Sequence, residues 1–360
     1  MNVLSFESSC DETAVAVLRA EGNRLTLLAD IIASQADTHR LYGGVVPEIA
    51  SRAHVEAISA LAYEALDAAA LSLSDIDLIA VTANPGLIGA LLVGVNFAKA
   101  LSSANGIPLV GVDHIKGHIA AAYIADQNKT VPKPPFLALV VSGGHTSFFL
   151  AEDYNRHRLL GTTRDDAMGE AFDKVGRLLD LPYPAGAAFD LLAKEGFDAL
   201  GTDVLHYAKT AAARDAEWHL PTPALLGDAA PDLSFSGPKT AAVNLMHKLN
   251  QKNQTIDRAR FAAHFTYVAV EGITRQLSSV MDKHPGLPIV LAGGVAANSH
   301  LRSMVADLCQ KRGVPCILPP RSLTGDNGAM IAAAGYYAYL AGETADSTLN
   351  ASAADSPAIS

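Results

Sequence analysis

The chain has 360 residues, of which 49% are hydrophobic and 18% charged, with a formal net charge of −10 and a pI of about 5.6. This acidity argues against a broad basic surface for nucleic acid, although a local patch or a basic partner can still bind RNA. No apolar run reaches the length of a membrane span, and the N-terminus lacks the basic segment of a signal peptide. Three cysteines without metal-type or redox-type spacing favour a reducing compartment, so we expect a cytoplasmic protein without membrane segments.

The first part of the chain predicts an antiparallel sheet followed by alternating strands and helices. Alternating or short apolar runs predict strands, and apolar residues at helical spacing predict helices. The expected strands are residues 3–7, 13–18, 25–32 and 78–81, and the expected helices are residues 49–69 and 90–104. Polar residues from Ser8 to Glu12 form the first turn, and glycine-containing turns follow at 37–48 and 82–89.

The same plan restarts after a proline-rich linker at 128–135. The second set of expected strands is residues 136–141, 147–150 and 288–291, with glycine turns at 142–146 and 292–298. The expected helices that follow are residues 299–311 and 331–340. A hairpin followed later by a strand, a glycine turn and a helix therefore occurs twice, which indicates a duplicated scaffold.

This duplication predicts an α/β protein of two similar lobes, organised like the actin, Hsp70 and sugar-kinase (ASKHA) fold. Turns at the strand ends of such sheets are expected to point into a cleft. We expect the first lobe at residues 1–110 plus about 326–341, and the second at 111–325 with a largely helical insertion at about 165–284. Small polar residues predict a disordered tail at 342–360.

A pair of histidines provides the first candidate for chemistry. His114 and His118 follow an apolar strand and open a helical run, so that their imidazoles share one helix face. Such a pair can bind one metal ion, but the same spacing also occurs between histidines that are simply packed or exposed. Asp326, at the start of the last helix, is either an N-cap or a third, oxygen ligand.

Glycine turns can expose backbone N–H groups to an anion, and three of them in a duplicated scaffold favour a nucleotide phosphate site. The chain has no P-loop motif. The His pair has the spacing of a metallopeptidase H-E-x-x-H motif, but Ile115 stands where that motif needs its general base. A metal here is therefore better suited to orienting substrate oxygens or to acting as a Lewis acid.

Taken together, these segments resemble the bacterial tRNA N6-adenosine threonylcarbamoyltransferase family, once described as O-sialoglycoprotein endopeptidases. The resemblance extends from the N-terminus to about Gly335. It is carried by the segments at residues 7–13, 42–52, 113–118, 141–146, 169–174, 293–298 and 325–330. The sequence departs from the family at Ala83-Asn84-Pro85-Gly86, where Gly-Pro-Gly is common, and at Pro238, where Leu is usual.

The resemblance implies transfer of a threonylcarbamoyl group from threonylcarbamoyl-AMP to N6 of adenosine 37, in tRNAs that read codons beginning with A. It implies that His114, His118 and Asp326 hold one divalent metal ion, Fe²⁺ or alternatively Zn²⁺. The residues that it assigns to substrate binding are Val140, Val141, Ser142, Gly143, Gly144, Asp173, Gly186, Asp190 and Asn298. The implied partners are tRNA, an inactive paralogue of the TsaB type and a small ATPase of the TsaE type.

Asp11 and Glu12, on the first hairpin turn, are candidates to orient the attacking amine or to take its proton, but the turn can equally be structural. Two other classes of function remain open. An ATPase or kinase of the same fold does not need a His–His–Asp site. A metallopeptidase needs the glutamate that Ile115 replaces.

Overall fold

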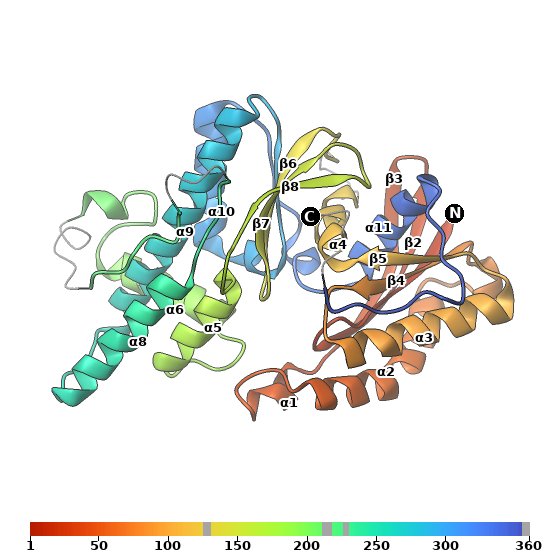
Figure 1. Cartoon of the computed structure of the whole chain (residues 1–360), viewed down its shortest axis with the longest axis horizontal. Coiled ribbons are helices and arrows are strands. Elements are labelled where there is room, and N and C mark those ends of the chain that lie inside the picture. The colour runs from red at the N-terminus through yellow and green to blue at the C-terminus, as the bar shows by residue number, and fades with distance from the viewer. Residues whose placement is uncertain (125–130, 211–217, 226–229, 355–360) are drawn as a thin grey trace. The chain divides into compact units, whose positions relative to one another are not determined.

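The structure is a computed structural model that describes residues 1–124, 131–210, 218–225 and 230–354 (Figure 1). Part of the linker expected at 128–135 lies outside the described residues. The chain divides into two compact units. Unit 1 contains Met1–Phe136, Ala151–Arg158 and Pro319–Ser360, and unit 2 contains Leu137–Leu150 and Leu159–Leu318.

The sheet of unit 1 has the strand order β3-β2-β1-β4-β5. Its strands are β1 (Asn2–Glu7), β2 (Glu12–Glu21), β3 (Arg24–Ser34), β4 (Leu78–Asn84) and β5 (Leu109–Asp113). Strand β1 pairs antiparallel with β2 and parallel with β4, and β4 pairs parallel with β5. The helices are α1 (Ala36–Arg40), α2 (Pro47–Ala68), α3 (Ile88–Asn105), α4 (His114–Ala120) and α11 (Gly328–Leu340).

Helices cover both faces of this sheet (Figure 1). A Cβ placed on Gly94 of α3 would lie 3.5 Å from Val81, and one on Gly335 of α11 would lie 2.4 Å from the Cβ of Ala80. Successive residues of a strand point to opposite faces, so α3 and α11 pack on opposite sides of β4. The nearly all-apolar sequence of α11 is explained by this central position, since its residues from Gly328 to Ala338 are all buried.

The sheet of unit 2 has the strand order β10-β9-β6-β7-β8. Read from the other edge, β8-β7-β6-β9-β10, it corresponds strand for strand to the order in unit 1. Its strands are β6 (Phe136–Val141), β7 (Thr146–Ala151), β8 (His157–Thr162), β9 (Ile289–Ala292) and β10 (Cys316–Ile317). Strand β6 pairs parallel with β9, and β9 pairs parallel with β10, as β1, β4 and β5 do in unit 1. The duplicated plan expected from the sequence is therefore present. Strands β8 and β10 were not among the strands expected in this part of the chain.

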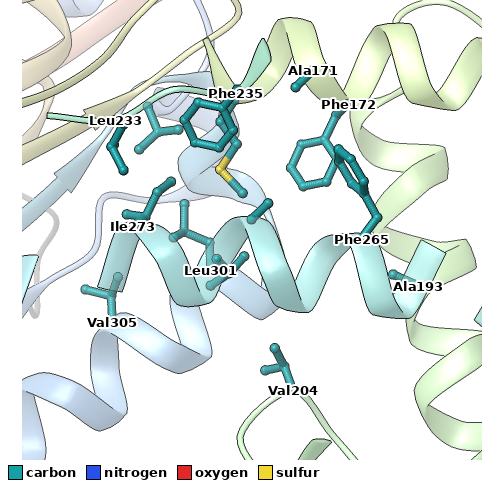
Figure 2. Close-up of a cluster of buried hydrophobic side chains, with 14 of the residues drawn as sticks. Ala171, Phe172, Ala193, Val204, Leu233, Phe235, Phe265, Ile273, Leu301 and Val305 are labelled. Carbon is teal, nitrogen blue, oxygen red and sulfur yellow. The ribbon is translucent and has the colours of Figure 1, made fainter. Parts of the chain in front are cut away.

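The insertion in unit 2 is largely helical, with irregular segments such as residues 218–225 and 230–235, where the structure describes it. Its helices are α5 (Met168–Leu178), α6 (Gly186–Ala199), α8 (Ser236–Gln251) and α9 (Arg258–Lys283), and α10 (Ser299–Arg312) follows β9. Figure 2 shows Phe172 of α5 facing Phe265 of α9, with ring centroids 5.9 Å apart. Leu301 and Val305 of α10 join the same buried cluster, so the insertion shares one apolar core with the sheet.

The units differ from the expected lobes at three segments, since residues 111–136, 151–158 and 319–325 all belong to unit 1, and they also differ in the tail. Residues 111–136 belong to unit 1, because β5 pairs with β4 and continues directly into α4. The tail is also not disordered where it is described. The amide of Ala345 donates to Leu109 O at 2.8 Å, and the amide of Ser352 donates to Ala83 O at 2.9 Å.

We call residues 343–352 the C-terminal strap. Leu349 packs where Gly111 has no Cβ, and Lys99 Nζ donates to the carbonyl of Leu349 at 3.0 Å. The strap thereby covers β5, which is an edge strand of the sheet. Its small polar side chains predicted disorder, because most of the contacts that hold the strap are made by backbone atoms and not by side chains. Residues 355–360 lie outside the described residues.

Candidate metal centre and substrate site

The helix that carries the two histidines has a firmly fixed start. Strand β5 ends at Asp113, whose Oδ1 accepts hydrogen bonds from the amides of Ile115 at 2.8 Å and Lys116 at 3.2 Å. An N-cap of this kind satisfies amide groups that have no partner inside the helix. The other oxygen, Oδ2, accepts from Asn84 Nδ2 at 2.7 Å. The first turn of α4 is thus tied to the end of β4.

His114, His118 and Asp326 form a cluster suited to a metal ion. Their ligand atoms all lie within 4.8 Å of one another. Asp326 Oδ1 lies 3.5 Å from His114 Nε2 and 3.4 Å from His118 Nε2. Two ligands at about 2.0–2.1 Å from one ion are separated by roughly 3–3.4 Å at octahedral or tetrahedral angles. The separations observed therefore match shared coordination.

His118 gives a second indication that this cluster fits a cation. Its side chain is fully buried, and neither of its ring nitrogens makes a hydrogen bond within the described part of the chain. Buried polar groups in proteins nearly always have a partner, and an orphaned imidazole nitrogen is costly. A metal ion between Nε2 and Asp326 satisfies that nitrogen, so the residues present fit the metal that the sequence suggested.

Asp326 does not cap the last helix. Asn327 does so instead, because its Oδ1 accepts from the amide of Met330 at 2.8 Å. The following Gly328 is fixed by two contacts: its amide donates to Asp30 Oδ1 at 3.0 Å, and its carbonyl accepts from Ser5 Oγ at 2.7 Å. The N-cap alternative for Asp326 is thereby removed, and its carboxylate faces the two histidines.

The charges around the cluster are strongly coupled. Burial lowers the pKa of His114, but Asp326 and Glu7 outweigh it and raise that pKa to about 9. Burial raises the pKa of Glu7, but His114 holds it below its usual value. Burial, Asp326 and Asp11 together raise the pKa of Glu12 to about 9. Several carboxyl groups thus lie close enough together for their negative charges to repel one another. A divalent cation among them would reduce this repulsion.

Asp11 and Glu12, the catalytic candidates, lie on the turn between β1 and β2. Glu12 Oε1 accepts from Ser34 Oγ at 3.2 Å, and the backbone carbonyl of Asp11 accepts from the amide of Gln35 at 2.9 Å. Both side chains are partly exposed. Ser9, which precedes Asp11 by two residues, has its Oγ 3.2 Å from His114 Nδ1, so the turn lies beside the metal cluster. Their roles in the reaction remain predictions.

The substrate candidates at 140–144 form the end of β6 and a tight turn. Val140 and Val141 are buried in the strand, and Ser142 Oγ accepts from the amide of His145 at 3.1 Å. Gly143 and Gly144 are exposed, and a Cβ on either would meet nothing within 4 Å. The turn thus leaves space at two glycine positions where a ligand can approach the backbone.

Two other segments meet this turn. A Cβ on Gly169 of α5 would lie 2.6 Å from Ser142 O, and one on Gly293 would lie 2.4 Å from Val141 O. Glycine is required at 293 for a second reason, because its φ is +91°. The glycine turn after β9 and the start of α5 therefore converge on the 140–144 turn within unit 2.

The remaining substrate candidates are linked through α6. Asp173 Oδ1 accepts from the amide of Ala185 at 2.7 Å, immediately before Gly186 begins that helix. Asp190 Oδ1 accepts from both the amide and Oγ of Ser299 at 3.0 Å. Asn298 caps α10 by accepting from the amide of Leu301 at 2.8 Å. Asp173 and Gly186 are thus neighbours, as are Asp190 and Asn298.

Three residues of the metal environment were not among the candidates. Glu7 is buried at the end of β1 and lies 3.1 Å from His114 Nδ1, with Ser9 Oγ at 3.2 Å from the same nitrogen. His54 of α2 holds the turn between β1 and β2. Its Nδ1 lies 2.7 Å from Thr13 Oγ1, and its Nε2 lies 2.9 Å from the carbonyl oxygen of Cys10. A carboxylate that ends an apolar strand was the available signal for Glu7.

A family described as TsaD, tRNA N6-adenosine threonylcarbamoyltransferase, matches residues 26–333. A protein of that name from Clostridium botulinum is 45% identical over 98% of this chain and 96% of its own length. Another from Moorella thermoacetica is 46% identical over 97% of this chain and 95% of its own length. In both cases the similarity covers the metal cluster and the substrate candidates.

Among solved structures, HypF from T. kodakarensis aligns with a TM-score of 0.58 at 13% identity, covering 95% of this chain and 48% of that chain. Component A of (R)-2-hydroxyglutaryl-CoA dehydratase from Acidaminococcus fermentans aligns with a TM-score of 0.50 at 13% identity, covering 95% of this chain and 98% of its own. At such identities the likeness concerns the fold alone, and it confirms the expected ASKHA organisation. Within the described residues, no helix is both long and apolar enough to span a membrane.

Proposed function

The chain belongs to the tRNA N6-adenosine threonylcarbamoyltransferase family, and we propose that His114, His118 and Asp326 hold the divalent metal ion that serves its reaction. The observation that supports this most directly is the pair of 3.5 Å and 3.4 Å separations from Asp326 Oδ1 to the two Nε2 atoms. A two-nitrogen, one-oxygen set suits Fe²⁺ and Zn²⁺. We propose Fe²⁺ as the ion in the cell, with Zn²⁺ as the alternative.

The enzyme is an acyltransferase that modifies tRNA. In the proposed reaction, N6 of adenosine 37 attacks the carbamoyl carbon of threonylcarbamoyl-AMP. A nitrogen–carbon bond forms, the bond from carbon to the phosphate oxygen breaks, and AMP leaves with the electron pair while N6 loses a proton. The product is t6A in tRNAs that read codons beginning with A. A metal ion held by His114, His118 and Asp326 would supply Lewis acidity at the threonylcarbamoyl group.

The protein groups then have two tasks, which are to position the donor and to stabilise the leaving AMP. We propose that the backbone of the 140–144 turn contacts the adenylate, since its glycine positions are open and its N–H groups can face developing negative charge. Asp173, Gly186, Asp190 and Asn298 are proposed to contact the ribose and base. A weakly nucleophilic aromatic amine gains most from being held in place.

Asp11 and Glu12 are proposed to orient the amine or to accept its proton. Their turn is held by His54 and adjoins the metal cluster, which supports this role. A peptidase is not favoured, since Ile115 is a buried apolar residue at the position where that chemistry needs a glutamate.

We further propose that the enzyme acts with an inactive paralogue and a small ATPase, in the cytoplasm where its tRNA substrate is found. An apolar groove of about 410 Å³ between α2 and α3 supports the proposal that a partner protein binds this chain. Its lining is Val55, Ile58, Ser59, Leu92, Val93, Asn96 and Phe97. Val55 is largely exposed. Tyr63, which lies outside the groove but further along α2, is also largely exposed. Exposed apolar patches of this kind mark interaction surfaces.

A transfer assay tests the proposed function. Purified protein, threonylcarbamoyl-AMP, unmodified tRNA and the two partners are incubated, and t6A is measured by mass spectrometry of nucleosides. We expect His118→Ala and Asp326→Asn to reduce the rate at least about 100-fold. His206→Ala, which alters an exposed histidine of unit 2, serves as the matched control. Absence of t6A with the wild type, or full activity of both metal-site variants, would refute the proposal.

A further inference from the structure

Glu7 is the most completely buried acidic side chain near the metal cluster, and each of its oxygens has a defined partner. Oε1 accepts from the amide of Ser9 at 2.5 Å. Oε2 accepts from Thr82 Oγ1 at 2.6 Å and lies 3.1 Å from His114 Nδ1. A buried carboxylate with these contacts is held in one orientation, since every rotation of the group loses a hydrogen bond.

We propose that Glu7 is a positioning residue that fixes the tautomer of His114, keeping the proton on Nδ1 and leaving Nε2 for the metal. This inference rests on the proposed metal site. Nε2 is the nitrogen that faces Asp326 Oδ1, at 3.5 Å, whereas Nδ1 faces Glu7. Carboxylates that accept from the second nitrogen of a ligating histidine orient the ring and increase its basicity.

The two histidines are therefore not equivalent. His114 Nδ1 has Glu7 and Ser9 as partners, whereas His118 Nδ1 has none among the residues that the structure describes. Asp326 faces Nε2 of both rings, but only His114 also has a carboxylate facing its Nδ1.

The change Glu7→Gln tests this inference with little change in volume. The amide of Ser9 donates to Oε1, so the glutamine oxygen must occupy that position and its NH₂ group must face Thr82 and His114. The hydroxyl of Thr82 can reverse and accept a hydrogen bond, since a hydroxyl both donates and accepts. His114 Nδ1 would then have to accept as well, which moves the ring proton to Nε2 and blocks the metal.

Zn²⁺ affinity is measured by competition with a chromophoric chelator. We expect Glu7→Gln to weaken binding about 10- to 100-fold, the range found when such supporting groups are altered. Thr82→Val is the matched control, because it removes one hydrogen bond from the same carboxylate and leaves the contact with His114 in place. We expect this control to stay within about threefold of the wild type. Equal affinities for Glu7→Gln and either the wild type or the control would overturn the inference.

A second measurement does not depend on whether the variant folds. In zinc-loaded wild-type protein, two-bond ¹H–¹⁵N NMR spectra of histidine rings, assigned with a His114→Gln sample, should show a proton on Nδ1 of His114. Coordination through Nδ1 with a proton on Nε2 would overturn the inference. If the wild type binds no zinc, iron or cobalt at all, the proposed metal site itself fails, an outcome distinct from the failure of Glu7 alone.

Discussion

Asn84 donates from its side-chain Nδ2 to Oδ2 of Asp113 at 2.7 Å, while Oδ1 of the same carboxylate caps the helix that carries His114 and His118. Asn84 stands where the resemblance led us to expect glycine, which has no side chain to make this contact. A departure in the glycine turn thus adds a connection between the end of β4 and the start of α4.

We predict that Asn84→Gly lowers the free energy of unfolding by about 1–2 kcal/mol, because one partly buried hydrogen bond to a charged group is lost. Zinc affinity should stay within about threefold, since the cap made by Oδ1 persists. Asp113→Ala removes both contacts and should weaken zinc binding as well as stability. Urea unfolding and chelator competition measure the two effects. A loss of zinc affinity in Asn84→Gly equal to that in Asp113→Ala would contradict this account.

The C-terminal strap leads to a prediction for hydrogen exchange. The amides of Ala345 and Ser352 donate to carbonyls of Leu109 and Ala83, so they should exchange more slowly than the amide of Thr348, whose acceptor is a side chain on the surface. Leu349→Asp should remove this protection, because it places a charge against Gly111 and Ala83. The matched change Asn350→Asp alters an exposed neighbour and should leave the protection intact. Rapid exchange at both amides in the wild type would contradict the packing of the strap.

His157 predicts a loss of stability in acid. Burial, with Lys116 as a smaller cause, lowers its pKa from the ordinary 6.5 to about 3. Between these values the unfolded chain binds a proton that the folded chain does not, so stability falls as the pH falls through this window. At pH 5 the effect of this one group is about 2 kcal/mol.

His157→Gln should therefore lose about 2 kcal/mol less than the wild type between pH 7 and pH 5 in urea unfolding. Glutamine can still bond the hydroxyl of Tyr123, which lies 3.2 Å from His157 Nε2. Parallel stability curves for His157→Gln and wild type would show that this residue is not responsible.

Two adjacent glycines offer a matched test of the turn that converges on the substrate candidates. Gly293 has a φ of +91°, and a Cβ there would lie 2.4 Å from Val141 O, whereas a Cβ on Gly294 would meet nothing within 4 Å. We predict that Gly293→Ala destabilises the protein by about 2 kcal/mol or more, and that Gly294→Ala stays within about 0.5 kcal/mol. Similar melting temperatures for the two variants would show that the turn relaxes freely.

Much of the fold follows from local pattern. The period of the apolar residues indicated the strands β1, β2 and β4 and the helices α2, α3 and α10 close to where they lie, because each buries one face or stripe. The order of the two sheets confirms the duplication. The short strand β10 was not predicted, since two residues carry no period and are defined by their partner β9.

The site was predictable where its members share one helix and less so where they do not. His114 and His118 are a turn apart in sequence, but the contact of Glu7 with His114 depends on how β1 pairs beside β4 and β5. The strap was mistaken for disorder because its contacts are made largely by backbone atoms, which leave no trace in composition. Tertiary pairing of this kind is not readable from side-chain pattern.

Unit 1 is closed by the last part of the chain, which has a consequence for biosynthesis. Helix α11, the proposed ligand Asp326 and the strap are all made after the whole of unit 2, whose last residue is Leu318. Domains commonly fold from the N-terminus during synthesis, but here one face of the N-terminal sheet stays uncovered until α11 has been synthesised, after all of unit 2. The proposed metal site is accordingly complete only once Asp326 has been synthesised. Premature termination before Asp326 would leave an exposed apolar sheet together with two histidines lacking their shared carboxylate.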